Sequence, residues 1–313
     1  MTTDIPAFDE LPVIEKLGLR HSWDVFGRDD NIGTINHLTP ERVVQAASLV
    51  RTGEVFNLTW PLDEPDPPMY GRRPVRHTIY PPARNELDDY LDDFYLQGSS
   101  QWDGLRHVRA REFGFYTGVT DEMTPGSGRL GVEHWVEHGI VGRGVLVDVA
   151  RHQESLGTPL VQVEGRSIEA DEIEAAARAQ GVELRPGDVL CIRLGWPGYY
   201  ETLSHDERLA MNQAMAFPGL SARESMARFL WDSQVAAVTC DNPSFEVSPG
   251  DPSIGYLHRR LIPSLGMAIG EFFRFDRLAV ACAEEGKWDF MFVSVPLHVR
   301  GGIGSPANAI AVR

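Results

Sequence analysis

The chain has 313 residues, of which 42% are hydrophobic, and its 45 acidic and 29 basic side chains give a formal net charge of −16. This apolar content is ample for a folded core, so a disordered or fibrous chain is excluded. The acidic balance argues against a nucleic-acid partner, which needs a basic face. No apolar run approaches the roughly 18 residues of a membrane span.

The cysteines and the N-terminal residues indicate a cellular compartment. Cys191, Cys240 and Cys282 are widely spaced and form no CxxC pair, which is typical of reduced thiols in a cytoplasmic protein. The opening residues, MTTDIPAFDE, contain no basic segment followed by an apolar one. We therefore expect no secretory signal and a cytoplasmic location.

Helix and strand signals alternate irregularly along the chain. N-capping residues and alanine-rich sequence predict helices at 39–49, 169–179, 221–231 and 257–265. The third helix opens with a capping-box pattern, Ser221 and Glu224. Runs rich in β-branched residues and bounded by turn formers predict strands at 145–149, 189–194, 236–239 and 290–295. This order predicts an α/β protein with a mixed sheet in one domain.

Residues 61–95 form the least regular part of the sequence. They contain seven prolines and an acidic run from Glu86 to Asp93. Proline lacks the N–H that a central strand requires, so we expect a long loop or an excursion at the edge of the sheet. Loops of this length in compact domains are often functional lids.

The densest group of polar residues lies in QGSSQWDGLRH, residues 97–107. If this segment is extended, alternate side chains share one face, because residues two apart in a strand point to the same side. The polar residues with this parity are Gln97, Gln101, Asp103 and His107. Two amides, a carboxylate and an imidazole on one face suit a metal or acid–base site. The alternative is a polar strand that faces solvent.

A second segment, HWVEH at residues 134–138, matches the H-x-x-E-H pattern in which a helix presents two histidines to zinc. Gly139 would end that helix directly after the second histidine. We therefore expect a short amphipathic helix here, and we expect neither His134 nor His138 to bind metal.

Two further features carry little weight alone. His258 and Glu271 are most simply interpreted as a capping histidine and a surface carboxylate. They gain significance only if the fold brings them to residues 97–107. The glycine-rich segments 142–144 and 301–304 do not follow a strand and open a helix. They predict turns, so no nucleotide cofactor is expected.

Several blocks, in this order, resemble the cyclase family of metal-dependent hydrolases, which includes bacterial kynurenine formamidase and isatin hydrolase. The blocks are FGRDDNIGTIN at 26–36, GRGVLVD at 142–148, PGDVLCIRLGW at 186–196 and GGIGSPAN at 301–308. The resemblance implies an α/β fold of the swivelling β/β/α type with a mixed sheet. It also implies a single domain over 1–313, with an N-terminal extension and the proline-rich loop at 61–95.

The family signature H-x-G-T-H-x-D-x-P-x-H falls on residues 97–107. Asp103 and His107 match it, whereas Gln97 and Gln101 replace two metal-binding histidines. The resemblance places later family ligands on His258 and Glu271. Because an amide oxygen binds zinc less well than imidazole, we expect at most one Mn²⁺ or Zn²⁺ ion, of modest affinity, and the alternative is that no ion binds tightly. The implied ligands are Gln101, Asp103, His258 and Glu271.

The resemblance implies hydrolysis of an amide, cyclic amide, or lactone or ester bond of a small organic substrate, with metal-activated water as the nucleophile. His107 would act as base and proton shuttle, and Asp103 and Glu271 would anchor the ion. Four other residues would contact an aromatic or apolar substrate: Gln97, Trp102, Phe115 and Tyr116. Core packing is the alternative for the three aromatic residues.

Two other functions remain open. Without metal, Asp103, His107 and Glu271 would support a lyase, cyclase or isomerase reaction by acid–base chemistry. A chain that lost two ligands could also be a non-catalytic ligand-binding protein. The resemblance further implies a homodimer or homotetramer, with the N-terminal region covering a neighbour's pocket. The remaining expected partner is the small-molecule substrate, with no nucleic acid and no membrane.

Overall fold

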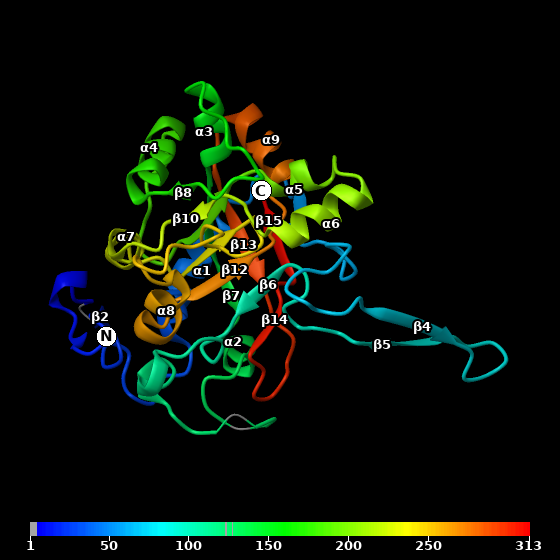
Figure 1. Ribbon diagram of the computed structural model, residues 1–313, viewed down its shortest axis with the longest axis horizontal. Coiled ribbons are helices and arrows are strands. Elements are labelled where there is room, and N and C mark those ends of the chain that lie inside the picture. The colour runs from blue at the N-terminus through cyan, green and yellow to red at the C-terminus, as the bar shows by residue number, and fades with distance from the viewer. Residues whose placement is uncertain (1–4, 123, 127) are drawn as a thin grey trace.

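The computed structural model describes residues 5–122, 124–126 and 128–313, and a mixed sheet of nine strands lies at its centre (Figure 1). Across the sheet the strands are β14 (Gly304–Pro306), β6 (Gln101–Asp103), β12 (Ala268–Glu271), β11 (Ala237–Cys240), β9 (Val189–Arg193), β7 (Ile140–Asp148), β13 (Asp289–Ser294), β15 (Ala309–Val312) and β3 (Val55–Asn57). Strands β12, β11, β9 and β7 are mutually parallel, and both flanks are antiparallel. This confirms the predicted α/β fold with a mixed sheet.

The central strands are buried on both faces. In β9, residues 189–192 are completely buried, as expected of apolar parallel strands covered on both sides. Strand β7 is longer than predicted, because Gly142 and Gly144 lie inside it rather than in a turn. A Cβ atom at Gly142 would overlap the Leu38 side chain, and one at Gly144 would overlap the ring of Phe290. These glycines therefore allow neighbouring side chains to pack directly on the strand.

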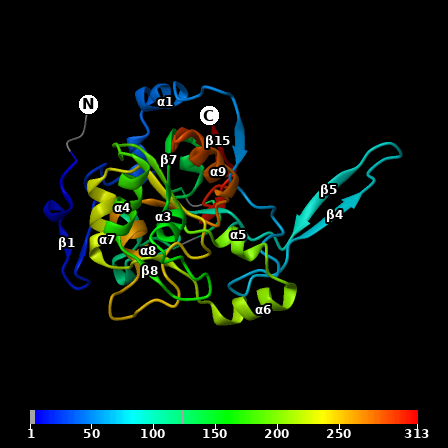
Figure 2. The ribbon, with the colours of Figure 1, turned by 90° about the horizontal axis from the view of Figure 1, so that it is seen from above.

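The helices flank the sheet, with α1 on one side of β7 and α3 and α4 on the other (Figure 2). They are α1 (Pro40–Ala47), α2 (Glu133–His138), α3 (Val149–Ser155), α4 (Ala170–Gln180), α5 (Trp196–Tyr200), α6 (His205–Ala214), α7 (Glu224–Asp232), α8 (Leu257–Arg259) and α9 (Asp276–Glu285). Within the described ranges, every helix is too short or too polar to traverse a bilayer.

All four predicted helices are present, with differences at their ends. Thr39 caps α1, accepting a hydrogen bond from the backbone N–H of Arg42. Helix α7 begins three residues later than predicted, because the Ser221 hydroxyl accepts from the N–H of Arg223 and no capping box forms there. Helix α8 continues into a π-helical turn over Arg260–Leu265, and Pro263 lies within that turn.

Three small sheets complete the fold: β1 (Val13–Ile14) with β2 (Leu19–Arg20), β8 (Ser167–Ile168) with β10 (Gly219–Leu220), and β4 (Arg76–Tyr80) with β5 (Asp88–Asp92). The last pair lies within residues 61–95, where a long loop or an excursion at the edge of the sheet was expected, and it corrects the first of these alternatives. It is a hairpin that projects from the body of the molecule in both views (Figures 1 and 2). Cross-strand contacts hold it, including His77 Nε2 at 2.7 Å from Asp89 Oδ2 and the rings of Tyr80 and Tyr90 at 5.9 Å.

Candidate active site

The pairing of β6 with β12 brings the two separated polar segments together. The antiparallel register sets Gln101 opposite Glu271 and Trp102 opposite Gly270. Because side chains alternate along a strand, Gln101 and Asp103 share one face with Glu271, and Trp102 points to the other face. The Gln101 amide Nε2 donates to Glu271 Oε2 at 2.6 Å.

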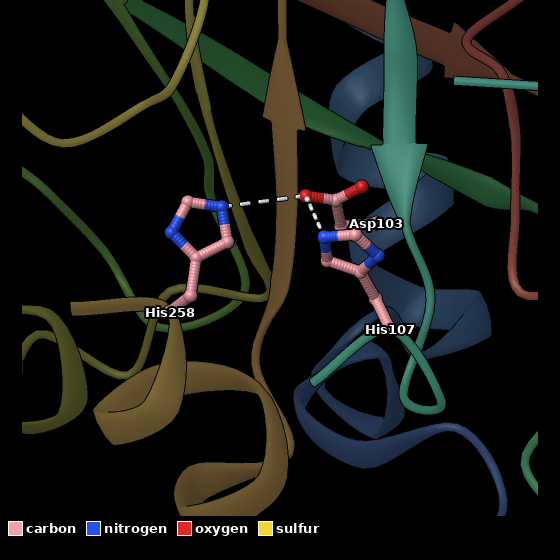
Figure 3. Close-up of side chains that lie close together, drawn as sticks. All are labelled: Asp103, His107 and His258. Atoms are coloured by element: carbon pink, nitrogen blue, oxygen red, sulfur yellow. Dashed lines mark ion pairs between the residues drawn. The ribbon is translucent and has the colours of Figure 1, made fainter. Parts of the chain in front are cut away.

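Asp103 lies between two imidazoles (Figure 3). His107 follows β6 in the next turn, and His258 lies in α8. Asp103 Oδ2 is 3.5 Å from His258 Nε2 and 3.7 Å from His107 Nε2. This oxygen is buried and has no hydrogen-bond partner among the residues that the structure describes. The arrangement leaves a carboxylate oxygen and two ring nitrogens facing one small space.

Two other carboxylates contact the ring of His258. Glu246 Oε1 is 2.6 Å from His258 Nδ1, and Glu271 Oε1 is 3.2 Å from His258 Nε2. The ring of Tyr256 stacks on the imidazole, with centroids 4.9 Å apart and an interplanar angle of 6°. His258 is therefore fixed in orientation by groups on both ring nitrogens and on its face.

The buried charges shift one another's ionisation. Burial alone would lower the pKa of His258, but the neighbouring carboxylates of Asp103, Glu246 and Glu271 raise that pKa well above its ordinary value. Burial, reinforced by the charge of Asp103, raises the pKa of Glu271 to about 7. Burial lowers the pKa of His107. Burial opposes ionisation of Asp103, yet the two histidines hold its pKa below the usual range.

The Gln97 side chain contacts two residues of the site. Its Nε2 donates to Asp103 Oδ1 and lies 3.0 Å from His107 Nδ1. Its amide nitrogen is therefore engaged with two other site residues, and the expectation that Gln97 contacts substrate stays a prediction. Gln97 acts as a positioning group for Asp103 and His107.

A cavity of about 370 Å³ opens onto this group of residues. Five polar residues were expected to converge in one cavity, and four of them, Gln101, His107, His258 and Glu271, line it, whereas the fifth, Asp103, is completely buried beside them. The other lining residues are Tyr70, Arg72, Ser244, Glu246, Val247, Ser248, Gly250, Gly255 and Tyr256. Sequence reasoning missed Tyr70, Arg72, Glu246 and Tyr256. The only signal for the first two was their place in the proline-rich segment, which was expected to be a functional lid.

The aromatic residues expected to line the pocket lie in the core instead. Trp102 is completely buried, its ring packs edge-on against Phe273 at 5.4 Å, and its Nε1 donates to Ser294 Oγ. Phe115 and Tyr116 are also buried in the hydrophobic core. The alternation of side chains along β6 explains Trp102, because the strand's other face forms the site.

A family model described as "Putative cyclase" matches residues 56–247. A crystal structure of "a novel cyclase" is 32% identical, with a TM-score of 0.82, and the match covers 94% of this chain and 99% of the other. This chain belongs to the cyclase family.

More distant structures share the fold of this cyclase-family protein. Isatin hydrolase A from Labrenzia aggregata is 16% identical, with a TM-score of 0.59, covering 87% of this chain and 97% of the other. A "predicted metal-dependent hydrolase" from Bacillus stearothermophilus is 17% identical, with a TM-score of 0.50, covering 82% and 97%. No curated protein matches the chain.

The side chains of this cyclase-family protein fit one divalent ion. Ligand atoms of Asp103, His107 and His258 all lie within 4.8 Å of one another. Gln101 Oε1, like Asp103 Oδ2, is buried without a hydrogen-bond partner in the described part of the chain. The cluster differs from the expected ligand set, because His107 takes part in it, whereas Glu271 is bonded to the Gln101 amide.

The H-x-x-E-H segment lies in α2, which ends at Gly139 as predicted. His134 Nε2 lies 2.9 Å from the carbonyl oxygen of Gly128, and His138 Nδ1 lies 2.9 Å from that of Gly139. His138 is exposed and His134 is half-buried, and each contacts a backbone carbonyl, as expected of an amphipathic surface helix.

Proposed function

We propose that this cyclase-family protein is a hydrolase that cleaves an amide, cyclic amide, or lactone or ester bond of a small organic substrate. The observation that carries the proposal is the buried Asp103 oxygen without a hydrogen bond, set between His258 and His107 beside the cavity. This oxygen faces a ring nitrogen of each histidine, so a cation placed there would be held by one carboxylate oxygen and two imidazole nitrogens.

Asp103, His107 and His258 would hold the ion, with Gln101 Oε1 beside them. A carboxylate with two imidazoles suits Zn²⁺ or Mn²⁺. When bound, such an ion polarises a carbonyl and lowers the pKa of water. Gln97 keeps Asp103 and His107 in place through its amide nitrogen.

Glu271 is the proposed proton carrier. Its pKa of about 7 lies near the working pH, where a general base or acid is most effective. It lines the cavity and would accept a proton from the attacking water. It would then return that proton to the leaving nitrogen or oxygen as the C–N or C–O bond breaks, which gives a carboxylic acid and an amine or alcohol.

The test is a screen of the purified protein against amides, lactones and formanilides, with and without added Mn²⁺ or Zn²⁺. We expect hydrolysis that depends on the ion and is lost in Asp103→Asn, a variant of nearly the same shape. Glu137→Gln, which changes an exposed carboxylate in α2, is the matched control. Hydrolysis that survives both chelation and Asp103→Asn would contradict the proposal.

A second candidate, an ion-independent lyase, cyclase or isomerase, is favoured by one observation. Glu271 has a pKa of about 7, and the pKa of His107 is lowered, so an acid–base pair faces the cavity without any ion. Turnover of a substrate without net addition of water, unchanged by chelator, would select this candidate over the hydrolase.

A further inference from the structure

Arg72 lies in the cavity wall, and within the described ranges its guanidinium forms no close ion pair. It lines the cavity together with Glu271, His107 and His258. Its Nη1 atom is buried and has no hydrogen-bond partner among the residues described, and in that part of the chain no carboxylate lies within 4.0 Å of its guanidinium. The next residue, Arg73, differs, because its Nη2 is 2.6 Å from Asp93 Oδ1. A buried guanidinium N–H without an acceptor is costly, so a ligand with an acceptor suits this place.

The backbone that carries Arg72 is anchored by the two residues 69 and 70. Met69 is buried in an apolar cluster with Trp60 and Phe272. The Tyr70 hydroxyl donates to the carbonyl oxygen of Pro243 at 3.0 Å, which ties the segment to the loop after β11. The Arg72 guanidinium also lies 5.1 Å from the centre of the Tyr70 ring, a cation–π distance. Its charge is therefore held in position before a ligand arrives.

The aromatic residues in the cavity lining indicate the shape of a ligand that would pair with Arg72. Tyr70 and Tyr256 both belong to the lining, and aromatic residues in a cavity wall suit a planar group. A planar guanidinium pairs best with a carboxylate, which accepts two parallel N–H bonds.

We propose that Arg72 binds the carboxylate of a small, planar organic acid in this cavity. The inference rests on the proposed function, because it takes the cavity to be the substrate site. The carboxylate has two sources: a group that the substrate carries beside its scissile bond, or the carboxylate that hydrolysis creates.

The first experiment measures binding alone. Benzoate and its uncharged counterpart benzamide are titrated by calorimetry into the full-length protein with Mn²⁺ present, and in parallel with chelator. We expect Arg72→Gln to weaken benzoate binding about 10- to 100-fold, the loss typical of a charge-assisted hydrogen bond, and to leave benzamide unchanged. Arg72→Lys should restore part of the affinity.

Arg73→Gln is the matched control. It removes the same charge at the next residue, an exposed arginine that pairs with Asp93. It should bind benzoate like the wild type, and melting temperatures verify that each variant folds. Benzoate binding that is absent from the wild type, or equal in Arg72→Gln and Arg73→Gln, would overturn the proposal.

The second experiment separates the two sources of the carboxylate. For a substrate with its own carboxylate, Arg72→Gln should raise KM about 10- to 100-fold relative to a neutral analogue. For a product carboxylate, KM should hold and inhibition by product should weaken by the same factor. If the protein is hydrolytically active and shows neither effect, the role of Arg72 is contradicted and the proposed function is not. Benzoate binding through Arg72 in a protein without hydrolytic activity would contradict the proposed function alone.

Discussion

Glu246 Oε1 lies 2.6 Å from Nδ1 of His258, and the other oxygen of the same carboxylate accepts the backbone N–H of Leu257 at 2.7 Å. One side chain therefore both caps the start of α8 and fixes the imidazole that this helix carries. With Nδ1 occupied by Glu246, the other ring nitrogen of His258 faces Asp103 and Glu271. Carboxylates in this position orient metal-binding histidines in many proteins.

Glu246→Gln should weaken Mn²⁺ binding about 10- to 100-fold, the usual cost of losing an outer-shell carboxylate. The amide oxygen can still accept the Leu257 N–H, so we expect the fold to persist. Calorimetric titration with Mn²⁺ checks the affinity, and Glu201→Gln, at an exposed ion pair with Arg274, is the control. Equal affinity in wild type and Glu246→Gln would show that Glu246 does not orient the ligand.

His107→Ala tests whether this histidine binds the ion or only moves protons. Since its Nε2 belongs to the Asp103, His107 and His258 cluster, we expect Mn²⁺ affinity to fall at least about 10-fold. Turnover should be lost at low Mn²⁺ and recover at saturating Mn²⁺. Unchanged Mn²⁺ affinity with turnover lowered about 10²- to 10⁴-fold would instead assign His107 the proton-transfer role.

The sequence predicted the sheet better than it predicted the site. The apolar, β-branched run at residues 189–192 predicted a buried strand, and the structure confirms it in β9. Gln101 and Asp103 are two residues apart, so the sequence also predicted that they share one face of a strand, because the alternation of side chains depends only on neighbouring residues. Glu246 and Arg72 gave no such signal, because their positions depend on long-range packing of loops that follow no period.

Trp102→Ala should cost stability rather than substrate affinity. The indole is completely buried among Trp135, Phe273 and Phe292, and removing such a side chain typically lowers the free energy of unfolding by about 3–5 kcal/mol. Urea denaturation measures the loss. Trp102→Phe keeps most of the volume and should fold with an unchanged KM. A raised KM in folded Trp102→Phe would indicate that Trp102 contributes to the substrate pocket.

Stability should fall in mild acid through His37. Burial, together with the charge of Arg42, lowers the pKa of His37 to about 4, against about 6.5 in an unfolded chain. The unfolded state therefore takes up the proton first, so this contribution is present above about pH 6.5 and is lost as pH falls towards 4.

The matched measurement compares wild type with His37→Gln at pH 7.5 and pH 5. On acidification the wild type should lose up to about 2 kcal/mol more unfolding free energy than the variant. Urea denaturation at both values gives the difference. The same loss in both proteins would mean that other groups cause the acid sensitivity.

The central claim is that Asp103, His107 and His258 hold one divalent ion. Electron paramagnetic resonance of free Mn²⁺, titrated into the wild type and into Asp103→Asn, counts the bound ions directly. We expect about one Mn²⁺ per chain in the wild type and none at the same concentrations in Asp103→Asn. Two ions per chain, no binding to the wild type, or unchanged binding in Asp103→Asn would contradict the claim.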